Sequence, residues 1–320
     1  SAKRPLGLGR ATTISVRIAA PRVGLPPRHS QCRRTWNPNP SSNLIDHSTA
    51  FSYTNAGRRK DAHPHMEAII TAGGCPAPKE SLYPLTQGGF KAMLPIAGKP
   101  MIRWVLEAVA AAPHVDQIVV VGLPAMDLLA CRKPVTLVED HGGLMDNIAA
   151  GAAAVLRLNP AAERTVLFSS DIPALTPLMV EWMIEQVQAS DHEVWYTVIE
   201  RSVMEASFPG SRRTYTHLKN LELCGGDVVG LDPRLTQSDH PLFVKLSAAR
   251  KSPVRQAALL GFDTLFLLLL RQLALSEAER LISRRLGVRG RALLTPYAAM
   301  GMDVDKPNQY ELLKAALEPN

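Results

Sequence analysis

The chain has 320 residues, 46% of them hydrophobic, which is enough for one large α/β domain or two smaller ones. Its formal net charge is +7, but residues 1–65 contain eleven Lys or Arg and two Asp, so the other 255 residues together carry −2. The body therefore lacks the basic surface that DNA- and RNA-binding domains carry, and we predict no nucleic-acid partner.

Four cysteines are scattered over the chain and form no C-x-x-C pair: Cys32, Cys75, Cys131 and Cys224. Their number is far below that of small secreted disulfide scaffolds, so we predict a reducing, cytoplasmic location. The most apolar run, residues 265–270, is much shorter than the ~20 residues that cross a bilayer. We therefore expect a buried helix there and no membrane association.

Residues 1–65 differ in composition from the rest of the chain and form a basic leader. They are rich in Pro, Ser, Thr and Asn and show no sustained period of 2 or 3.6, which predicts a disordered segment outside the fold. We interpret them as upstream sequence before a natural start at Met66; an Arg-rich, acid-poor transit peptide is the alternative. The folded domain is then expected at residues 66–320.

From Met66 onward, short apolar strands alternate with helical patterns. Strands are predicted at residues 67–72, 117–122, 135–138, 165–169 and 193–199, and helices at 100–112, 124–131, 144–158 and 176–189. This alternation predicts an α/β fold with a mostly parallel sheet covered by helices on both faces. Ligands of such sheets bind outside the carboxyl ends of the strands.

Beyond residue 200 the pattern loosens. Strands are predicted at 213–219, after a glycine turn within 225–231, and at 289–294; helices are predicted at 241–250, 253–273, 276–286 and from about residue 307. We expect residues 200–295 to be a helical and β insertion that covers the sheet edge where an acceptor would sit. Candidate acceptor contacts are Arg213, Tyr215, Lys219 and Asp227, which a solvated strand and turn explain equally well.

The first strand ends abruptly in Ala72-Gly73-Gly74, and a loop rich in Pro, Gly and Lys follows it. Two glycines allow positive φ angles and leave the backbone amides open to a ligand. Lys91 comes after this loop, directly before a strand-like segment at 93–96. Bare amides and a returning lysine suit a polyphosphate, which predicts a nucleotide-handling enzyme; a solvated loop lysine is the alternative for Lys91.

Three aspartates are the candidate metal ligands. Asp171 follows the strand at 165–169, where it either binds a divalent cation or caps the turn into the next helix. Asp303 and Asp305 precede the last helix, and an N-cap of that helix is the alternative role for Asp305. Mg²⁺ usually takes one or two carboxylates plus substrate phosphates. Alternation places Asp303 and Asp305 on the same face, so either of them completes the site with Asp171.

Gly142 and Gly143 follow the third strand and lead into a helix at Leu144, so they either face a nucleobase or ribose or form an ordinary loop. Several familiar signatures are absent: G-x-G-x-x-G after the first strand, G-x-x-x-x-G-K-[ST], H-E-x-x-H and G-x-S-x-G. A plain dehydrogenase, a P-loop kinase, a zinc protease and an α/β-hydrolase are disfavoured accordingly.

Four motifs carry a resemblance: residues 69–74 (IITAGG), 91–101 (KAMLPIAGKPM), 170–173 (SDIP) and 303–307 (DVDKP). Together they resemble the nucleotidyltransferases with a MobA-like domain, which are related to sugar-phosphate nucleotidylyltransferases and GT-A glycosyltransferases. The resemblance implies a three-layer α/β/α, Rossmann-like (GT-A-type) fold. It also implies Mg²⁺-dependent transfer of a nucleotidyl group from an NTP to a phosphorylated acceptor, with release of pyrophosphate.

By position, the resemblance implies that Gly73 and Gly74 contact the NTP, that Lys91 neutralises phosphate charge, and that Asp171 binds metal with Asp305 or Asp303. The chain departs from the family in its loop, because the family has an arginine soon after the glycines. Here residues 75–80 read CPAPKE, and no arginine occurs in the body before Arg103. Triphosphate binding would then depend on Lys91, helped by Lys79.

Two other functions stay open at this point. A GT-A-type glycosyltransferase would use a nucleotide-sugar, but it needs a D-x-D motif after a mid-domain strand, and the body has one only at Asp303–Asp305. A non-catalytic nucleotide-binding domain would account for the missing arginine.

Deletion of residues 1–65 is expected to leave the melting temperature almost unchanged, because a segment that buries little apolar surface adds little to stability. Thermal denaturation of the full chain and of residues 66–320 measures the difference. A fall of more than a few degrees would contradict an unstructured leader.

Overall fold

A computed structural model describes residues 65–124, 129–249 and 272–318, all of which belong to one compact unit. Residues 1–64, the apolar run at 265–270 and most of the helix expected at 253–273 lie outside the described residues, as does the middle of the helix expected at 124–131. None of the helices in the described ranges combines the length and the apolar character that crossing a bilayer requires.

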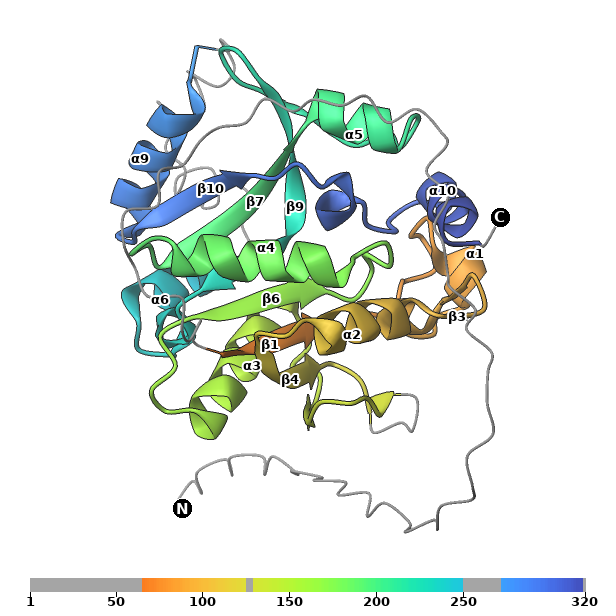
Figure 1. The fold of residues 1–320 in the computed structure, drawn as a ribbon, viewed down its shortest axis with the longest axis horizontal. Coiled ribbons are helices and arrows are strands. Elements are labelled where there is room, and N and C mark those ends of the chain that lie inside the picture. Colours follow the sequence, from red (N-terminus) through yellow and green to blue (C-terminus); the bar gives the residue numbers. More distant parts are fainter. Residues whose placement is uncertain (1–64, 125–128, 250–271, 319–320) are drawn as a thin grey trace, which may run out of the picture. The chain divides into compact units, whose positions relative to one another are not determined.

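An eight-stranded sheet runs through the described part of the chain (Figure 1). Its strands are β1 (Met66–Thr71), β4 (Val115–Val121), β5 (Val135–Val138), β6 (Thr165–Ser169), β7 (Val194–Glu200), β8 (Thr216–His217), β9 (Glu222–Leu231) and β10 (Gly290–Leu294). Seven strands follow the order β10-β7-β9-β6-β1-β4-β5, and β8 pairs with β9. β1 lies parallel to β4 and β6, β4 to β5 and β7 to β10, whereas β9 lies antiparallel to its neighbours. The mostly parallel sheet expected from the sequence is confirmed.

Most helices begin and end close to the predicted positions, whereas no sequence pattern predicted the two short helices at residues 83–86 and 201–207. The helices are α1 (Tyr83–Thr86), α2 (Met101–Ala111), α3 (Leu144–Leu158), α4 (Pro177–Gln188), α5 (Arg201–Ser207), α6 (Pro241–Ala249), α9 (Leu275–Leu286) and α10 (Pro307–Leu317). A small antiparallel ribbon, β2 (Pro95–Ile96) with β3 (Lys99–Pro100), precedes α2. Local signals set the ends: the Thr176 hydroxyl accepts from the N–H of Met179 at 3.4 Å to cap α4, and Gly287 ends α9 with a φ of 75°.

Both faces of the sheet are covered, which is why its strands read as continuous apolar runs. In β1, Ala68 and Ile70 pack in one cluster with α2 and α4, while Ile69 packs with α3 in another. Figure 1 shows α2 and α4 together in front of the central strands. The result is the expected three-layer α/β/α arrangement, in which β1 and β6 end at the same edge of the sheet.

The sequence led us to expect that residues 200–295 only cover the sheet edge. Instead, part of this segment belongs to the sheet itself. β9 is built into the sheet between β6 and β7, and β10 forms the edge beside β7. Gly225 and Gly226, which we expected in a turn, lie inside β9. A Cβ at Gly226 would stand 2.1 Å from Oγ1 of Thr197, so close packing between strands accounts for this glycine. The strand expected at 213–219 shortens to β8.

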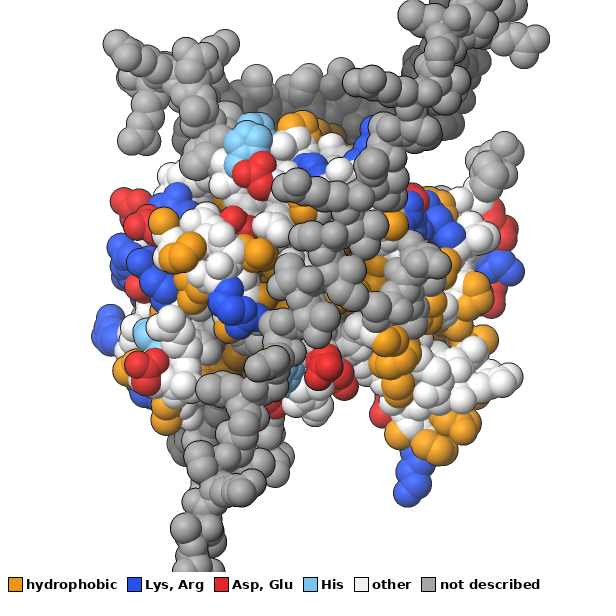
Figure 2. Space-filling model, turned by 90° about the horizontal axis from the view of Figure 1, so that it is seen from below, with side chains coloured by type: hydrophobic (Ala, Val, Ile, Leu, Met, Phe, Trp, Pro, Cys, Tyr) orange, Lys and Arg blue, Asp and Glu red, His pale blue; other side chains and the backbone are white. Residues whose placement is uncertain are grey.

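Acidic and basic side chains lie interspersed over the described part of one face of the molecule (Figure 2). Hydrophobic side chains lie between them in small groups. Such mixing is usual for folded proteins, because apolar atoms supply more than half of their accessible surface.

Gly151 lies where α3 packs on the sheet, and an added Cβ would stand 2.8 Å from Cγ2 of Ile69 and 3.0 Å from Cγ2 of Val121. We expect Gly151→Val to lower the free energy of unfolding by about 1–3 kcal/mol, the usual range for overpacking. Ala153→Val, at an exposed position of the same helix, is the matched control and should change it by about 0.5 kcal/mol or less. Urea denaturation measures both; equal stabilities would mean that α3 does not pack this closely on the sheet.

Candidate functional site

Three segments of the chain meet at the carboxyl ends of β1 and β6. The loops after these two strands are joined by the N–H of Ser170, which donates to the Thr71 carbonyl at 3.0 Å. The segment before α10 joins them through the N–H of Val304, which donates to the Asp171 carbonyl at 3.0 Å. Backbone hydrogen bonds therefore fix the separations among the segments that carry the candidate site residues.

Lys91 opens a short 3₁₀ helix, Lys91–Met93, and bridges two carboxylates. Its N–H donates to the Gly74 carbonyl at 3.0 Å, which places it beside the loop that begins with Ala72-Gly73-Gly74, called the glycine loop below. Its Nζ donates to Oδ2 of Asp171 at 2.6 Å and to Oδ1 of Asp305 at 2.5 Å. Burial alone would lower the pKa of Lys91, but the charges and hydrogen bonds of these two carboxylates outweigh burial and raise it. Lys91 is therefore a fixed positive charge at neutral pH.

Asp171, Asp303 and Asp305 each offer one oxygen atom, and these three atoms lie within 4.8 Å of one another. The side chain of Asp171 is 13% exposed and that of Asp305 is 57% exposed, so the group opens toward solvent on one side. Ser169 donates from Oγ to Oδ1 of Asp171 at 2.5 Å. Clustered carboxylate oxygens fit a hard divalent cation such as Mg²⁺. The structure brings both Asp303 and Asp305 to Asp171, although the sequence expectation required only one of them.

The glycine loop packs against the loop before α3. A Cβ at Gly73 would stand 2.6 Å from Nδ2 of Asn147 and 2.8 Å from Oδ1 of Asp140, so no larger residue fits without a shift. Asn147 is buried, donates to Asp140 at 2.7 Å and accepts from the N–H of His141 at 2.7 Å. Asn147 was not among the residues predicted from the sequence. The feature that would have indicated it is a polar residue near the start of a helix, on the side of the helix that faces the sheet.

The other predicted binding residues lie around this contact. The N–H of Ala72 donates to the Val121 carbonyl at 2.7 Å, so it is engaged in the sheet. Gly74 and Gly142 have φ angles of 124° and 77°, which glycine adopts readily. Gly143 is the extended N-cap of α3. The structure thus brings Gly142 and Gly143 next to the glycine loop through the Asp140–Asn147 pair.

Arg213 and Asp227, expected only as acceptor contacts, lie beside the candidate metal ligands. Arg213 forms an ion pair with Asp303, and its Nη2 lies 3.9 Å from Oδ2 of Asp227. Burial raises the pKa of Asp227 to about 7, and the negative charge of Asp171 adds to this effect. No sequence signal predicts their convergence, because Arg213 lies in a loop and Asp227 in a strand that long-range pairing places in the sheet.

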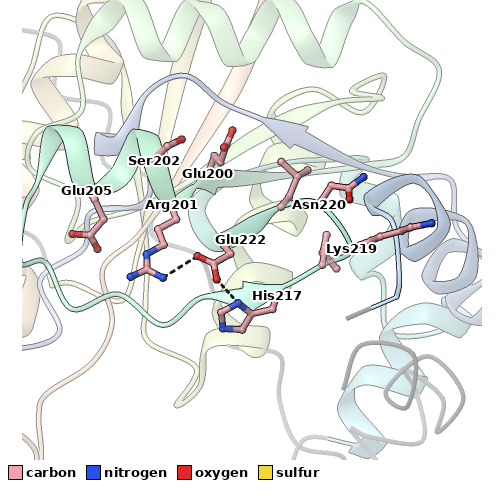
Figure 3. A pocket seen from close by; sticks show the side chains of 10 residues that line it. Glu200, Arg201, Ser202, Glu205, His217, Lys219, Asn220 and Glu222 are labelled. Atoms are coloured by element: carbon pink, nitrogen blue, oxygen red, sulfur yellow. Dashed lines mark hydrogen bonds and ion pairs between the residues drawn. The ribbon is translucent and has the colours of Figure 1, made fainter. Parts of the chain in front are cut away.

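A cavity of about 610 Å³ lies where α5 meets the turn between β8 and β9 (Figure 3). Two of its charged side chains pair with each other, since Glu222 accepts from Nη1 of Arg201 at 2.8 Å. Of the candidate acceptor contacts, Lys219 lines this cavity and Tyr215 donates to Glu205 at 2.7 Å. The cavity is thus a polar hollow on the α5 side. None of the three residues of the carboxylate cluster, Asp171, Asp303 and Asp305, lines it.

Comparisons with known proteins identify the family and the fold. The model of the family described as the MobA-like NTP transferase domain matches residues 68–258. A solved structure described as a hypothetical transferase from Thermus thermophilus is 34% identical, covers 77% of this chain and 99% of its own, and has a TM-score of 0.65. A 4-diphosphocytidyl-2C-methyl-D-erythritol synthase from Anaerococcus prevotii shares the fold at 12% identity, with a TM-score of 0.50 over 79% of this chain and 96% of its own.

A curated relative gives a shorter match. The 2-C-methyl-D-erythritol 4-phosphate cytidylyltransferase of Parasynechococcus marenigrum is 37% identical over 83 residues, which are 24% of this chain and 35% of the relative. The match therefore spans about a third of the length of that enzyme.

Asp227→Asn is expected to flatten the pH dependence of stability. Because the pKa of Asp227 is about 7 in the folded chain and 3.8 without the fold, the folded state binds the proton more tightly, and stability falls as the pH rises through this window. Melting of the metal-free chain between pH 5 and pH 8 measures the slope. Asp191→Asn, whose side chain is 92% exposed before substitution, is the control. Equal slopes in the unsubstituted chain and Asp227→Asn would contradict the raised pKa.

Proposed function

Because the chain belongs to the family of MobA-like NTP transferase domains, a nucleotidyltransferase family, we propose a specific reaction for it. A nucleotidyl group passes from an NTP to a phosphorylated small-molecule acceptor, and pyrophosphate is released. The observation that carries the proposal is the double ion pair of Lys91 with Asp171 and Asp305 beside the glycine loop. The cytidylyltransferase among the relatives makes CTP the first NTP to test.

The nucleotide would bind at the glycine loop. At Gly74 nothing lies within 4 Å of the place where a Cβ would stand, so a phosphate or nucleoside can approach the backbone closely there. Lys91 holds its charge next to this loop, since its pKa is raised. In the absence of the arginine that the family carries after the glycines, Lys91 is the cation with which the phosphates would pair.

Asp171, Asp303 and Asp305 would hold Mg²⁺, because their oxygen atoms are hard ligands grouped within 4.8 Å. Bound Mg²⁺ would neutralise charge on the phosphates during transfer. The residues of the chain act by positioning: Ser169 orients Asp171 through its 2.5 Å hydrogen bond, and Lys91 draws Asp171 and Asp305 together. An acceptor phosphate is already anionic at neutral pH, so the reaction needs no general base.

The acceptor would bind on the side of α5, β8 and β9. Three features support this side: Arg213 reaches the carboxylate cluster from it, Lys219 lies on it, and the polar cavity of Figure 3 opens there.

We place the reaction in the cytoplasm; the free state of the three described cysteines, Cys75, Cys131 and Cys224, supports a reducing compartment.

Incubation of the full chain with each NTP, Mg²⁺ and a panel of phosphorylated acceptors tests the proposal. Release of pyrophosphate together with a nucleotidylated acceptor is the expected result. Release of a nucleoside diphosphate from a nucleotide-sugar would indicate a GT-A-type glycosyltransferase instead. Nucleotide binding without turnover across the panel would indicate a non-catalytic domain.

Asp171→Asn is expected to lower the rate of pyrophosphate release at least about 100-fold, the scale of losing one electrostatic contact to the reacting groups. The substitution keeps the size of the side chain and removes its charge, so circular dichroism should show an intact fold. Asp191→Asn, at a side chain that is 92% exposed, removes the same charge from the surface and should leave the rate unchanged. Near-normal turnover in Asp171→Asn would remove this residue from the site.

A further inference from the structure

Arg213 reaches the carboxylate cluster from a loop that lies 90 residues before Asp303 in the sequence. Its Nη1 donates to Oδ1 of Asp303, and its Nη2 donates to the Gly225 carbonyl at 3.1 Å. The side chains of Arg213 and Asp303 are 14% and 9% exposed. A planar guanidinium with two anchored nitrogens has little freedom to turn, so it also restricts the carboxylate that it holds.

The loop that carries Arg213 is itself docked on the segment that follows Asp303 and Asp305. Nζ of Lys306 donates to the Arg212 carbonyl at 3.2 Å. Nδ2 of Asn308 donates to the carbonyls of Gly210 and Ser211 at 3.3 and 3.4 Å. These bonds fix the distance between the loop and the carboxylate-bearing segment independently of the ion pair.

Arg212 adopts a φ of 54°, in the left-handed region that most residues avoid. Its side chain is exposed, whereas that of Arg213 points into the cluster. The unusual backbone conformation therefore occurs directly before the residue that contacts Asp303, where the surrounding hydrogen bonds hold it in place.

We infer that Arg213 is a positioning residue of the proposed metal site: it holds Asp303 where its carboxylate can bind a divalent cation together with Asp171 and Asp305. The inference rests on the proposed function. Residues that orient metal ligands through hydrogen bonds typically contribute 10- to 100-fold to metal affinity. If Arg213 only compensated the negative charge of the cluster, its removal would strengthen the attraction for a cation. The two roles therefore predict opposite changes in affinity.

Calorimetric titration of the full chain with Mn²⁺, without nucleotide, separates these roles. Arg213→Gln removes the charge and keeps most of the side-chain volume, and we expect it to weaken Mn²⁺ binding at least tenfold. Arg212→Gln removes the same charge from the neighbouring exposed position and should change the dissociation constant less than twofold. If Arg213→Gln does not fold, Arg213→Lys replaces it, because lysine keeps the charge without the planar, two-armed geometry.

A double-substitution cycle tests whether Arg213 acts through Asp303. Asp303→Asn alone should weaken Mn²⁺ binding, and adding Arg213→Gln to it should produce no further loss. Independent, multiplicative losses would mean that Arg213 acts elsewhere and would overturn the inference.

Wild-type binding and Asp171→Asn separate the inference from the proposed function. If the wild type binds Mn²⁺ and Asp171→Asn does not, while Arg213→Gln binds as tightly as the wild type or more tightly, only the role of Arg213 is refuted. If the wild type itself binds no Mn²⁺, the proposed metal site is refuted together with the inference.

Discussion

Lys91 binds two stretches of chain that lie 80 and 214 residues after it, because its ammonium group contacts Asp171 and Asp305 at the same time. Three aspartates so close together would repel one another if no cation lay among them. The double ion pair therefore makes the carboxylate cluster tolerable in the folded protein. It also keeps a positive charge beside the glycine loop, where the phosphates of an NTP would bind.

The sheet supplies a rigid base for this interaction. β1 and β6 lie side by side with helices packed on both faces, so the loops at their carboxyl ends start from fixed positions. Close contacts extend this order into the loops, since Gly73 leaves room for Asp140 and Asn147. A site built on loops gains precision when each loop is held by neighbours in this way.

Two cations enter the carboxylate cluster from different sides. Lys91 comes from the glycine-loop side and pairs with Asp171 and Asp305, whereas Arg213 comes from the loop after α5 and pairs with Asp303. This division matches the proposed division of labour, with the nucleotide on the side of Lys91 and the acceptor on the side of Arg213. The partly buried carboxyl group of Asp227 lies on the Arg213 side, where burial and the charge of Asp171 raise its pKa.

Local features were readable in the sequence by itself. Continuous apolar runs indicated strands buried on both faces, and helical spacing indicated α3 between residues 144 and 158. The motifs indicated that Lys91 and Asp171 would lie near Asp303 or Asp305, and the structure shows this proximity. Each of these signals depends on residues that are neighbours in the chain. The insertion of β9 between β6 and β7, the pairing of Arg213 with Asp303 and the contact of Asn147 with Gly73 were decided only by the tertiary structure. They join residues that are far apart in the sequence, and packing of the whole sheet and its helices determines which of them meet.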